Sequence, residues 1–304
     1  MNEQKILIIL GPTSSGKTDL AVDLAKKYNG EVISADSRQV FKGLDIGSGK
    51  VTKKEMRGIP HHLLDVASPN RAFSVIQFKK KADSVIKDIL KRGKLPIIAG
   101  GTGFYIQAIV DNIVLPEVSP NLTLRKELEG LLREDREKAI KEMGRRLKKL
   151  DHRRFREIDQ KNPRRLMRAI EIATALGKVP KLKLPVALPL SILQIGIRTD
   201  DDVLKKRIGG RFEKRVKAGI VAEAENLHKK GMTWKRMNEI GLAHKHIASY
   251  LKNKISKEEM IENSIKEEKK YAKRQKTWFK RDKRIIWVNL ENHERIDKLV
   301  TDFL

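Results

Sequence analysis

The sequence predicts an α/β protein in which an all-helical segment interrupts a parallel sheet. Two observations carry this prediction. Short apolar runs alternate with amphipathic stretches of helical period in the outer parts of the chain, whereas the middle part shows helical spacing only. At ~150 residues per domain the 304 residues correspond to about two domains, and a hydrophobic content of 39% is enough for both to bury a core.

Buried parallel strands are expected at four short apolar runs, each followed by a loop or a glycine turn. These runs are Ile6 to Leu10, Val32 to Ala35, Leu63 to Val66 and Leu95 to Ala99. Helical periodicity marks Lys17 to Tyr28 and Ser74 to Arg92 between them. A long helix is expected from Ser256 onward, because Ser256 and Glu259 have the spacing of a capping box.

That last helix is strongly basic and carries aromatic residues. Nine of the sixteen residues from Lys269 to Arg284 are Lys or Arg, interleaved with Tyr271, Trp278 and Phe279. Aromatic residues at this spacing are more often core residues than platforms for stacked bases, and both interpretations stay open here.

The helical insertion is expected at residues 116–189, which leaves 1–115 and 190–304 for the α/β core. It begins after Leu115-Pro116 and ends in a segment, 178–189, that contains three prolines. Lys plus Arg minus Asp plus Glu is 66 − 39 = +27 for the chain. Its parts 1–115, 116–198 and 199–304 carry 18 − 11 = +7, 21 − 11 = +10 and 27 − 17 = +10, so the excess per residue is largest in the middle. A polyanion is therefore the expected partner, although any one basic pair can equally be the solvated side of a helix.

The composition excludes several classes of site. The sequence has no cysteine, which rules out disulfides, cysteine-bound zinc, iron–sulfur clusters and thiol nucleophiles. The opening apolar run is far shorter than the ~20 residues of a spanning helix, and no signal-cleavage pattern follows it. We expect no membrane partner, a cytoplasmic location and a monomer.

The strongest motif is GPTSSGKT at 11–18, which fits the phosphate-binding pattern G-x-x-x-x-G-K-[ST]. It follows a predicted strand and opens a predicted helix, as a P-loop must. Backbone N–H groups would converge on a phosphate there, Lys17 would reach terminal phosphate oxygens, and Thr18 can ligand Mg²⁺. The sequence thus predicts a P-loop NTPase-like parallel sheet core with Mg²⁺ as cofactor.

The acid expected beside a P-loop is Asp36, which directly follows the strand Val32 to Ala35. The strand Leu95 to Ala99 ends instead in the sequence GGTG at 100–103, which contains no acid. An aspartate at the carboxyl end of a parallel strand lies over the usual ligand crevice, where it can serve as metal ligand or general base. A simple turn or capping role is the third interpretation, and spacing alone leaves all three open.

With these motifs in place, the chain resembles the tRNA dimethylallyltransferases, which prenylate N6 of the adenosine immediately 3′ of the anticodon. The resemblance covers essentially the whole chain. Its seven ordered blocks are GPTSSGKTDLA at 11–21, SADSRQVFKGLDIGSGK at 34–50, PHHLLD at 60–65, GGTGFYI at 100–106, NPRRLMRAIEI at 162–172, EIGLAHKHIASYL at 239–251 and YAKRQKTWFKRD at 271–282. The family fold is a P-loop α/β core with a helical insertion that grips the anticodon arm.

The resemblance implies a role for each block. Asp36 would be the general base on the adenine amine, with a supporting hydrogen bond from Thr102. Arg211 is favoured over Arg207 as the clamp on the diphosphate, and a solvated arginine pair is the simpler alternative. The diphosphate of dimethylallyl diphosphate would be held by Gly11, Thr13, Ser14, Ser15, Gly16, Lys17 and Thr18, with Thr18 also on the metal. Contacts to the anticodon stem-loop of tRNA would come from Asp36, Ser37, Arg38, Gln39, Thr102, Arg125, Asn162, Pro163, Arg164, Arg165, Leu166, Ile240 and Gly241.

The chain departs from the family pattern at three places. The usual Val-Tyr is Val40-Phe41, Gly-Thr-Ala-Lys-Pro is replaced by the sequence GSGKV at 47–51, and Ile-Gly-Tyr is replaced by the sequence IGL at 240–242. The last change removes any contact that the family makes through that tyrosine.

Two other functions fit part of the sequence. A small-molecule P-loop kinase would use ATP, with Asp36 activating a hydroxyl, but it does not account for the charge of +27. A nucleic-acid-binding NTPase or RNA chaperone accounts for the charge but gives the Asp36 and Thr102 blocks no task. A kinase would consume ATP, an RNA-stimulated NTPase would hydrolyse it without changing the RNA, and a prenyltransferase needs only the allylic diphosphate.

Overall fold

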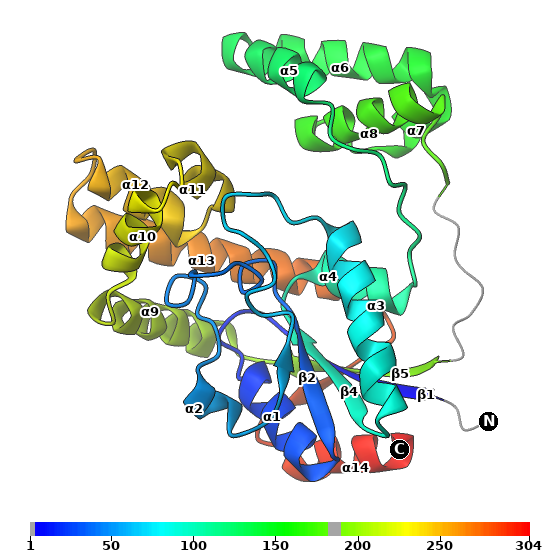
Figure 1. Ribbon diagram of the computed structural model, residues 1–304, viewed down its shortest axis with the longest axis vertical. Helices are drawn as coiled ribbons and strands as arrows, with labels where there is room; N and C mark the ends of the chain where they lie inside the picture. Colours follow the sequence, from blue (N-terminus) through cyan, green and yellow to red (C-terminus); the bar gives the residue numbers. More distant parts are fainter. Residues whose placement is uncertain (1–3, 182–189) are drawn as a thin grey trace. The chain divides into compact units, whose positions relative to one another are not determined.

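The computed structural model describes residues 4–181 and 190–304. Six strands form one parallel sheet in the order β3-β2-β4-β1-β5-β6 (Figure 1). The strands are β1 (Gln4–Leu10), β2 (Gly30–Ala35), β3 (His61–His62), β4 (Leu95–Gly100), β5 (Leu190–Arg198) and β6 (Ile285–Asn289). The predicted α/β class with a parallel P-loop-like core is confirmed.

Helices connect these strands. Before β5 the chain forms α1 (Lys17–Lys27), α2 (Lys53–Met56), α3 (Val75–Lys91), α4 (Gly103–Val110), α5 (Leu122–Glu134), α6 (Arg136–Leu150), α7 (His152–Glu157) and α8 (Pro163–Leu176). After β5 it forms α9 (Asp201–Lys217), α10 (Ile220–Lys229), α11 (Trp234–Ile240), α12 (Ala243–Leu251), α13 (Lys257–Phe279) and α14 (His293–Phe303).

Each face of the sheet is covered by helices, as the continuous apolar strands require. Along β1, Ile6 and Ile8 face a core that includes Phe78 of α3 and Ile106 of α4. The alternate residues Leu7 and Ile9 face a second core with residues of α1 and α14. This period of two places the end of β1 between two packed layers, with the P-loop just beyond it.

The chain divides into two compact units. One comprises residues 1–112 and 186–304, and the other comprises 113–185 and contains α5 to α8. The second unit has its own core, in which Leu128, Met143, Leu147 and Ile170 are buried. The end predicted for the insertion, Pro189, and most of the proline-containing segment before it lie outside the described residues. In the described part of the chain no helix is long and apolar enough to cross a membrane.

Most of the predicted elements are present. Three of the four predicted strands and the three predicted helices are confirmed, and α13 begins with the capping box of Ser256 and Glu259. The strand predicted at Leu63 to Val66 is wrong, because the strand here is His61–His62. Leu63 and Asp65 have φ angles of 62° and 55°, which end the extended run. Leu63 is buried although it lies outside a strand, so its apolar side chain does not indicate strand structure here.

The strands that carry the site approach each other closely at their carboxyl ends. Gly100 of β4 pairs with Ala35 of β2, and a Cβ at Gly100 would lie 2.3 Å from the Ala35 carbonyl oxygen. The same oxygen accepts a hydrogen bond of 3.1 Å from the Thr102 backbone N–H. Because Asp36 follows Ala35 directly, any residue larger than glycine at position 100 would displace the chain that carries Asp36.

We therefore expect Gly100→Ala to destabilise the protein by about 1–3 kcal/mol, the usual cost of overpacking. Chemical denaturation followed by circular dichroism measures this. Gly209→Ala is the matched control, because a Cβ there, inside α9, meets nothing within 4 Å. It should be neutral or stabilise by about 0.5–1 kcal/mol. Equal stability of the two variants would contradict the close approach.

Candidate functional site

The turn between β1 and α1 has the backbone geometry of an anion site. Ser14 and Gly16 have φ angles of 62° and 88°, which turn the chain back toward the helix. A Cβ at Gly16 would lie 2.5 Å from the Leu290 side chain, so this position needs glycine. No side chain caps α1, which leaves the N–H groups of its first turn directed at the space above β1.

Two buried hydroxyls of this turn are without hydrogen-bond partners among the described residues. They are Ser14 Oγ and Ser15 Oγ. Buried polar atoms in folded proteins are nearly always satisfied, so unsatisfied donors beside a P-loop indicate a ligand that accepts hydrogen bonds. A phosphate group meets this requirement.

Lys17 lies at the base of the same turn. Its Nζ donates a hydrogen bond of 3.1 Å to the Pro12 carbonyl oxygen. Burial, helped by the nearby Arg211 guanidinium, lowers the pKa of Lys17 to about 8, against the opposing effect of Asp36. A cation held in a desolvated place next to a second cation is stabilised when an anion binds.

Asp36 closes the turn that follows β2. Its Oδ1 accepts hydrogen bonds from the backbone N–H groups of Arg38 (2.8 Å) and Gln39 (3.3 Å). The turn role is therefore present, and it leaves Oδ2 for chemistry. Asp36 also lines a small cavity of the site. The two hydrogen bonds of the turn fix the direction of its carboxylate.

Thr102 supports Asp36 through the backbone. Thr102 Oγ1 accepts a hydrogen bond of 2.9 Å from the Ser37 N–H, one residue beyond Asp36. Tyr271 of α13 hydrogen-bonds Thr102 as well, and burial raises the pKa of the Tyr271 hydroxyl, which therefore stays protonated. The hydrogen bond expected from Thr102 thus reaches Asp36 by way of its neighbour in the chain.

The other residues of the turn after β2 are half-buried. Burial lowers the pKa of Arg38, with Tyr271 and Asp36 as the main opposing influences. Gln39 accepts a hydrogen bond from Ser34 Oγ (3.2 Å) and donates one to the Gly49 carbonyl (3.2 Å). Both side chains line the smaller cavity with Asp36.

Two cavities meet at the P-loop. The larger, about 560 Å³, is lined by Lys17, Thr18, Arg207, Arg211 and Lys214 among others. The smaller, about 70 Å³, is lined by Asp36, Arg38 and Tyr271 together with Lys17, Thr18 and Arg211. Arg211 borders both cavities whereas Arg207 borders only the larger one, which supports the preference for Arg211 as the diphosphate clamp.

The sequence interpretation missed Gln275. Its Oε1 accepts a hydrogen bond from the Thr13 N–H (2.9 Å), and its Nε2 donates one to the Gly101 carbonyl (2.8 Å). Gln275 therefore ties α13 to the P-loop and to the turn after β4. The available signal was its position four residues from both Tyr271 and Phe279, which places an uncharged amide on the buried face of a basic helix.

The residues predicted to contact tRNA from the insertion all lie in the second unit. Arg125 Nε and Nη2 donate to the buried Glu171 carboxylate at 2.6 Å and 3.0 Å. Asn162 caps α8 by accepting a hydrogen bond of 3.2 Å from the Arg165 N–H. Pro163 is the first residue of α8, Arg164 and Arg165 are exposed, and Leu166 is fully buried in the core of this unit. The two exposed arginines are thus the most accessible of the set.

The segment between α11 and α12 has unusual backbone angles. Ile240 is buried, Gly241 has φ 73°, and Leu242 has φ 49°, which is strained for a residue with a branched side chain. Leu242 lines the smaller cavity with Arg38 and Asp36. The residue that replaces the family tyrosine therefore offers this cavity an apolar surface.

The site can bind Mg²⁺ only if a substrate supplies some of the ligands. Among the described residues no three His, Asp or Glu side chains are grouped to hold a metal ion. Mg²⁺ commonly takes one or two protein ligands and completes its octahedron with phosphate oxygens and water. Thr18 and Asp36 line one cavity and can supply that small number of ligands.

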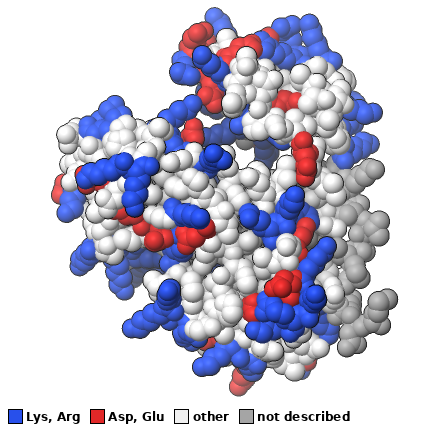
Figure 2. Space-filling view, viewed as in Figure 1, with Lys and Arg blue, Asp and Glu red and all other residues white. Residues whose placement is uncertain are grey.

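Basic side chains outnumber acidic ones on the viewed face (Figure 2). Figure 2 shows Lys and Arg side chains on both units of the viewed face, with fewer Asp and Glu among them. This distribution is consistent with the net charge of +27.

The fold and the site together define an α/β protein with a P-loop-like core and a candidate phosphate site at the carboxyl ends of its strands. Residues 39–282 match the family of IPP transferases, and the chain belongs to that family. It is 37% identical to the tRNA dimethylallyltransferase of Acetivibrio thermocellus over 97% of this chain and 95% of that one. It is 38% identical to the enzyme of the same name from a Thermoanaerobacter species, over 99% of this chain and 97% of that one.

A solved structure is similar over the same length. The full-length tRNA isopentenylpyrophosphate transferase of Bacillus halodurans superimposes with a TM-score of 0.71 at 33% identity, covering 99% of this chain and 98% of that chain. These comparisons confirm the family that the seven sequence blocks indicate and the prediction that the protein is a transferase.

Lys17 gives a test of the phosphate site. With a pKa of about 8, its positive charge is present at pH 7 and is lost as the pH rises through that value. We expect the affinity for an alkyl diphosphate, measured by titration calorimetry, to fall about tenfold between pH 7 and pH 9. Lys17→Arg, which stays charged over this range, should show a flatter profile. A flat profile for the unmodified protein would contradict a role of the Lys17 charge in binding.

Proposed function

We propose that the protein transfers the dimethylallyl group of dimethylallyl diphosphate to N6 of the adenosine immediately 3′ of the anticodon in tRNA and releases diphosphate. The observation that carries this proposal is the meeting of two kinds of group at one cavity. Lys17 and Arg211, which suit a diphosphate, border the same small cavity as Asp36, which suits an amine.

The phosphate groups of this site suit a leaving group. As the carbon–oxygen bond of the allylic diphosphate breaks, negative charge develops on the diphosphate. The amides of the P-loop, Lys17 and Arg211 supply positive charge where that charge develops, in a partly desolvated place that strengthens each interaction. In this reaction the P-loop holds a diphosphate leaving group, whereas in phosphoryl transfer it holds the phosphoryl group that is transferred.

Asp36 suits the other half of the reaction. The exocyclic amine of adenine forms a new bond to the allylic carbon and must lose one proton. Oδ1 of Asp36 already accepts two backbone hydrogen bonds, so Oδ2 is the oxygen that takes the proton. Thr102 and Tyr271 fix the segment that carries this carboxylate.

Mg²⁺ would be held by Thr18, and by the diphosphate oxygens, and would neutralise part of the charge on the leaving group. The residues of the chain bind the diphosphate, orient the carboxylate and accept the proton.

The target adenine must leave its stack in the RNA before it can react. An adenine in a stacked anticodon loop cannot reach a carboxylate within the protein, so the nucleotide is flipped toward Asp36. Arg38 and Gln39 border the small cavity that Asp36 lines, and the basic surface supplies contacts to the phosphate backbone.

The reaction and the role of Asp36 are tested together by mass spectrometry of tRNA nucleosides after incubation with dimethylallyl diphosphate and no ATP. The unmodified protein should prenylate one adenosine. Asp36→Asn keeps Oδ1 for the turn but removes the base, so kcat should fall by about 10²-fold or more while tRNA affinity stays nearly constant. Equal losses of affinity and kcat would exclude the role as base, and a need for ATP would favour the kinase.

The insertion is proposed to provide much of the affinity for tRNA. Replacing residues 113–185 by a short linker should leave a core that still binds dimethylallyl diphosphate but has lost tRNA. Because each neutralised phosphate adds about 0.9 to the salt slope on duplex nucleic acid, residual RNA binding should depend less on salt. Affinity for an anticodon stem-loop at several salt concentrations measures this. An unchanged slope would mean that the arginines of the insertion face only solvent.

A further inference from the structure

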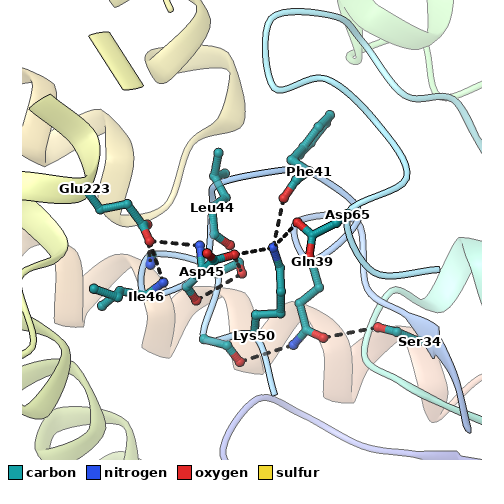
Figure 3. A network of polar contacts seen from close by, with 12 residues as sticks. Ser34, Gln39, Phe41, Leu44, Asp45, Ile46, Lys50, Asp65 and Glu223 are labelled. Carbon is teal, nitrogen blue, oxygen red and sulfur yellow. Dashed lines mark hydrogen bonds and ion pairs between the residues drawn. The ribbon is translucent and has the colours of Figure 1, made fainter. Parts of the chain in front are cut away.

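A single carboxylate organises the loop at residues 45–50, which lies next to the site. Glu223 of α10 accepts hydrogen bonds from three consecutive backbone N–H groups (Figure 3). Its Oε2 lies 2.9 Å from the Asp45 nitrogen and 2.7 Å from the Ile46 nitrogen, and its Oε1 lies 2.8 Å from the Gly47 nitrogen. Successive N–H groups of this kind form a concave anion site, and here the chain fills it with its own carboxylate.

The far end of the loop is fixed by Lys50. Its ammonium pairs with the carboxylates of Asp45 and Asp65 and donates to the Phe41 carbonyl at 3.0 Å. The Gly49 N–H donates to the Ile46 carbonyl at 3.0 Å, which closes the loop on itself. The loop is therefore held at both ends.

The Gly49 carbonyl connects the two halves of the site. It accepts a hydrogen bond from Arg211 Nη2 at 2.9 Å and another from Gln39 Nε2 at 3.2 Å. Gly49 has φ 60°, and a Cβ there would lie 2.5 Å from Arg211 Nη2. This is one of the positions where the chain departs from the family pattern, which has alanine here, and the positive φ favours the glycine of this chain.

We propose that Glu223 is a positioning residue for the reaction. By holding the loop, Glu223 fixes the Gly49 carbonyl, and that carbonyl fixes Arg211 at the diphosphate and Gln39 beside Asp36. The inference rests on the proposed function only for the identity of the substrates. Glu223 touches neither of them and acts through the loop.

The size of the effect follows from the bonds involved. A carboxylate that accepts three backbone hydrogen bonds holds them more strongly than a neutral amide does, because bonds to a charged acceptor are roughly twice as strong. Removing the charge loosens the loop without removing a contact to substrate. We expect the loosened loop to weaken the binding of the diphosphate that Arg211 holds.

Glu223→Gln tests this, with Glu225→Gln as the matched control. Glu225 lies on the same helix, and its exposed side chain forms an ion pair with Lys229 at 2.9 Å. Titration calorimetry with inorganic diphosphate and Mg²⁺ measures the dissociation constant without any RNA. We expect Glu223→Gln to weaken binding about tenfold and Glu225→Gln to change it less than about twofold. Equal effects of the two substitutions would overturn the proposal.

A double-mutant cycle separates positioning from general damage. Arg211→Gln alone should weaken diphosphate binding, and adding Glu223→Gln to it should then cost little more, because the group that Glu223 positions is gone. Losses that multiply would show that Glu223 acts independently of Arg211 and would also overturn the proposal. If Glu223→Gln does not fold, Glu223→Asp replaces it in the cycle, because its shorter side chain keeps the charge but draws the carboxylate away from the three N–H groups.

Prenylation assays distinguish a failure of the proposed function from a failure of the positioning role of Glu223. If the unmodified protein transfers no prenyl group to tRNA, the proposed function fails, while diphosphate binding still decides the role of Glu223. If the unmodified protein is active, Glu223→Gln should raise the KM for dimethylallyl diphosphate by about the factor found in the binding measurement. An unchanged KM in that variant would overturn the positioning role.

Discussion

The whole site depends on the convergence of three parallel strands at one edge of the sheet. β1, β2 and β4 are neighbours, so the turn after each of them opens into the same space. The first supplies the P-loop, the second Asp36 and the third Thr102, although these residues are far apart in the chain. Gly100 permits the approach, since any side chain there would meet the Ala35 carbonyl. Without this packing the phosphate groups and the carboxylate would not share a cavity.

The electrostatics of the site follow from this geometry. Burial lowers the pKa values of Lys17, Arg38 and Arg211. Asp36 interacts with all three, and Glu268 and Glu55 interact with Arg211 as well. Holding these cations in a partly desolvated place costs free energy. A diphosphate would relieve that cost on binding, and in the proposed reaction the same charges would stabilise it as it leaves.

Residues from distant helices hold the turns in place. Gln275 of α13 joins the P-loop to the turn after β4, and Tyr271 of the same helix hydrogen-bonds Thr102, which joins that turn to the chain beside Asp36. Glu223 of α10 performs the equivalent task for the loop that meets Arg211. Gln275 and Glu223 bind backbone groups in these contacts, so their effect is to fix the direction of the turns.

The sequence by itself determined the class of fold, the P-loop, the helix capped by Ser256 and the place of Asp36 at the end of a strand, because each of these depends on local spacing. It did not reveal β5 and β6, whose apolar runs follow a proline-containing segment and a basic helix and are recognisable only once they pair with β1 and with each other. It placed a strand at Leu63 to Val66 where left-handed backbone angles end the strand before Leu63. Only the tertiary structure decided how Arg211 differs from Arg207, what Gln275 contacts and which carboxylate holds the loop at 45–50. Those facts depend on contacts between residues more than 150 positions apart in the chain, such as Arg211 and Gly49, and no local pattern encodes them.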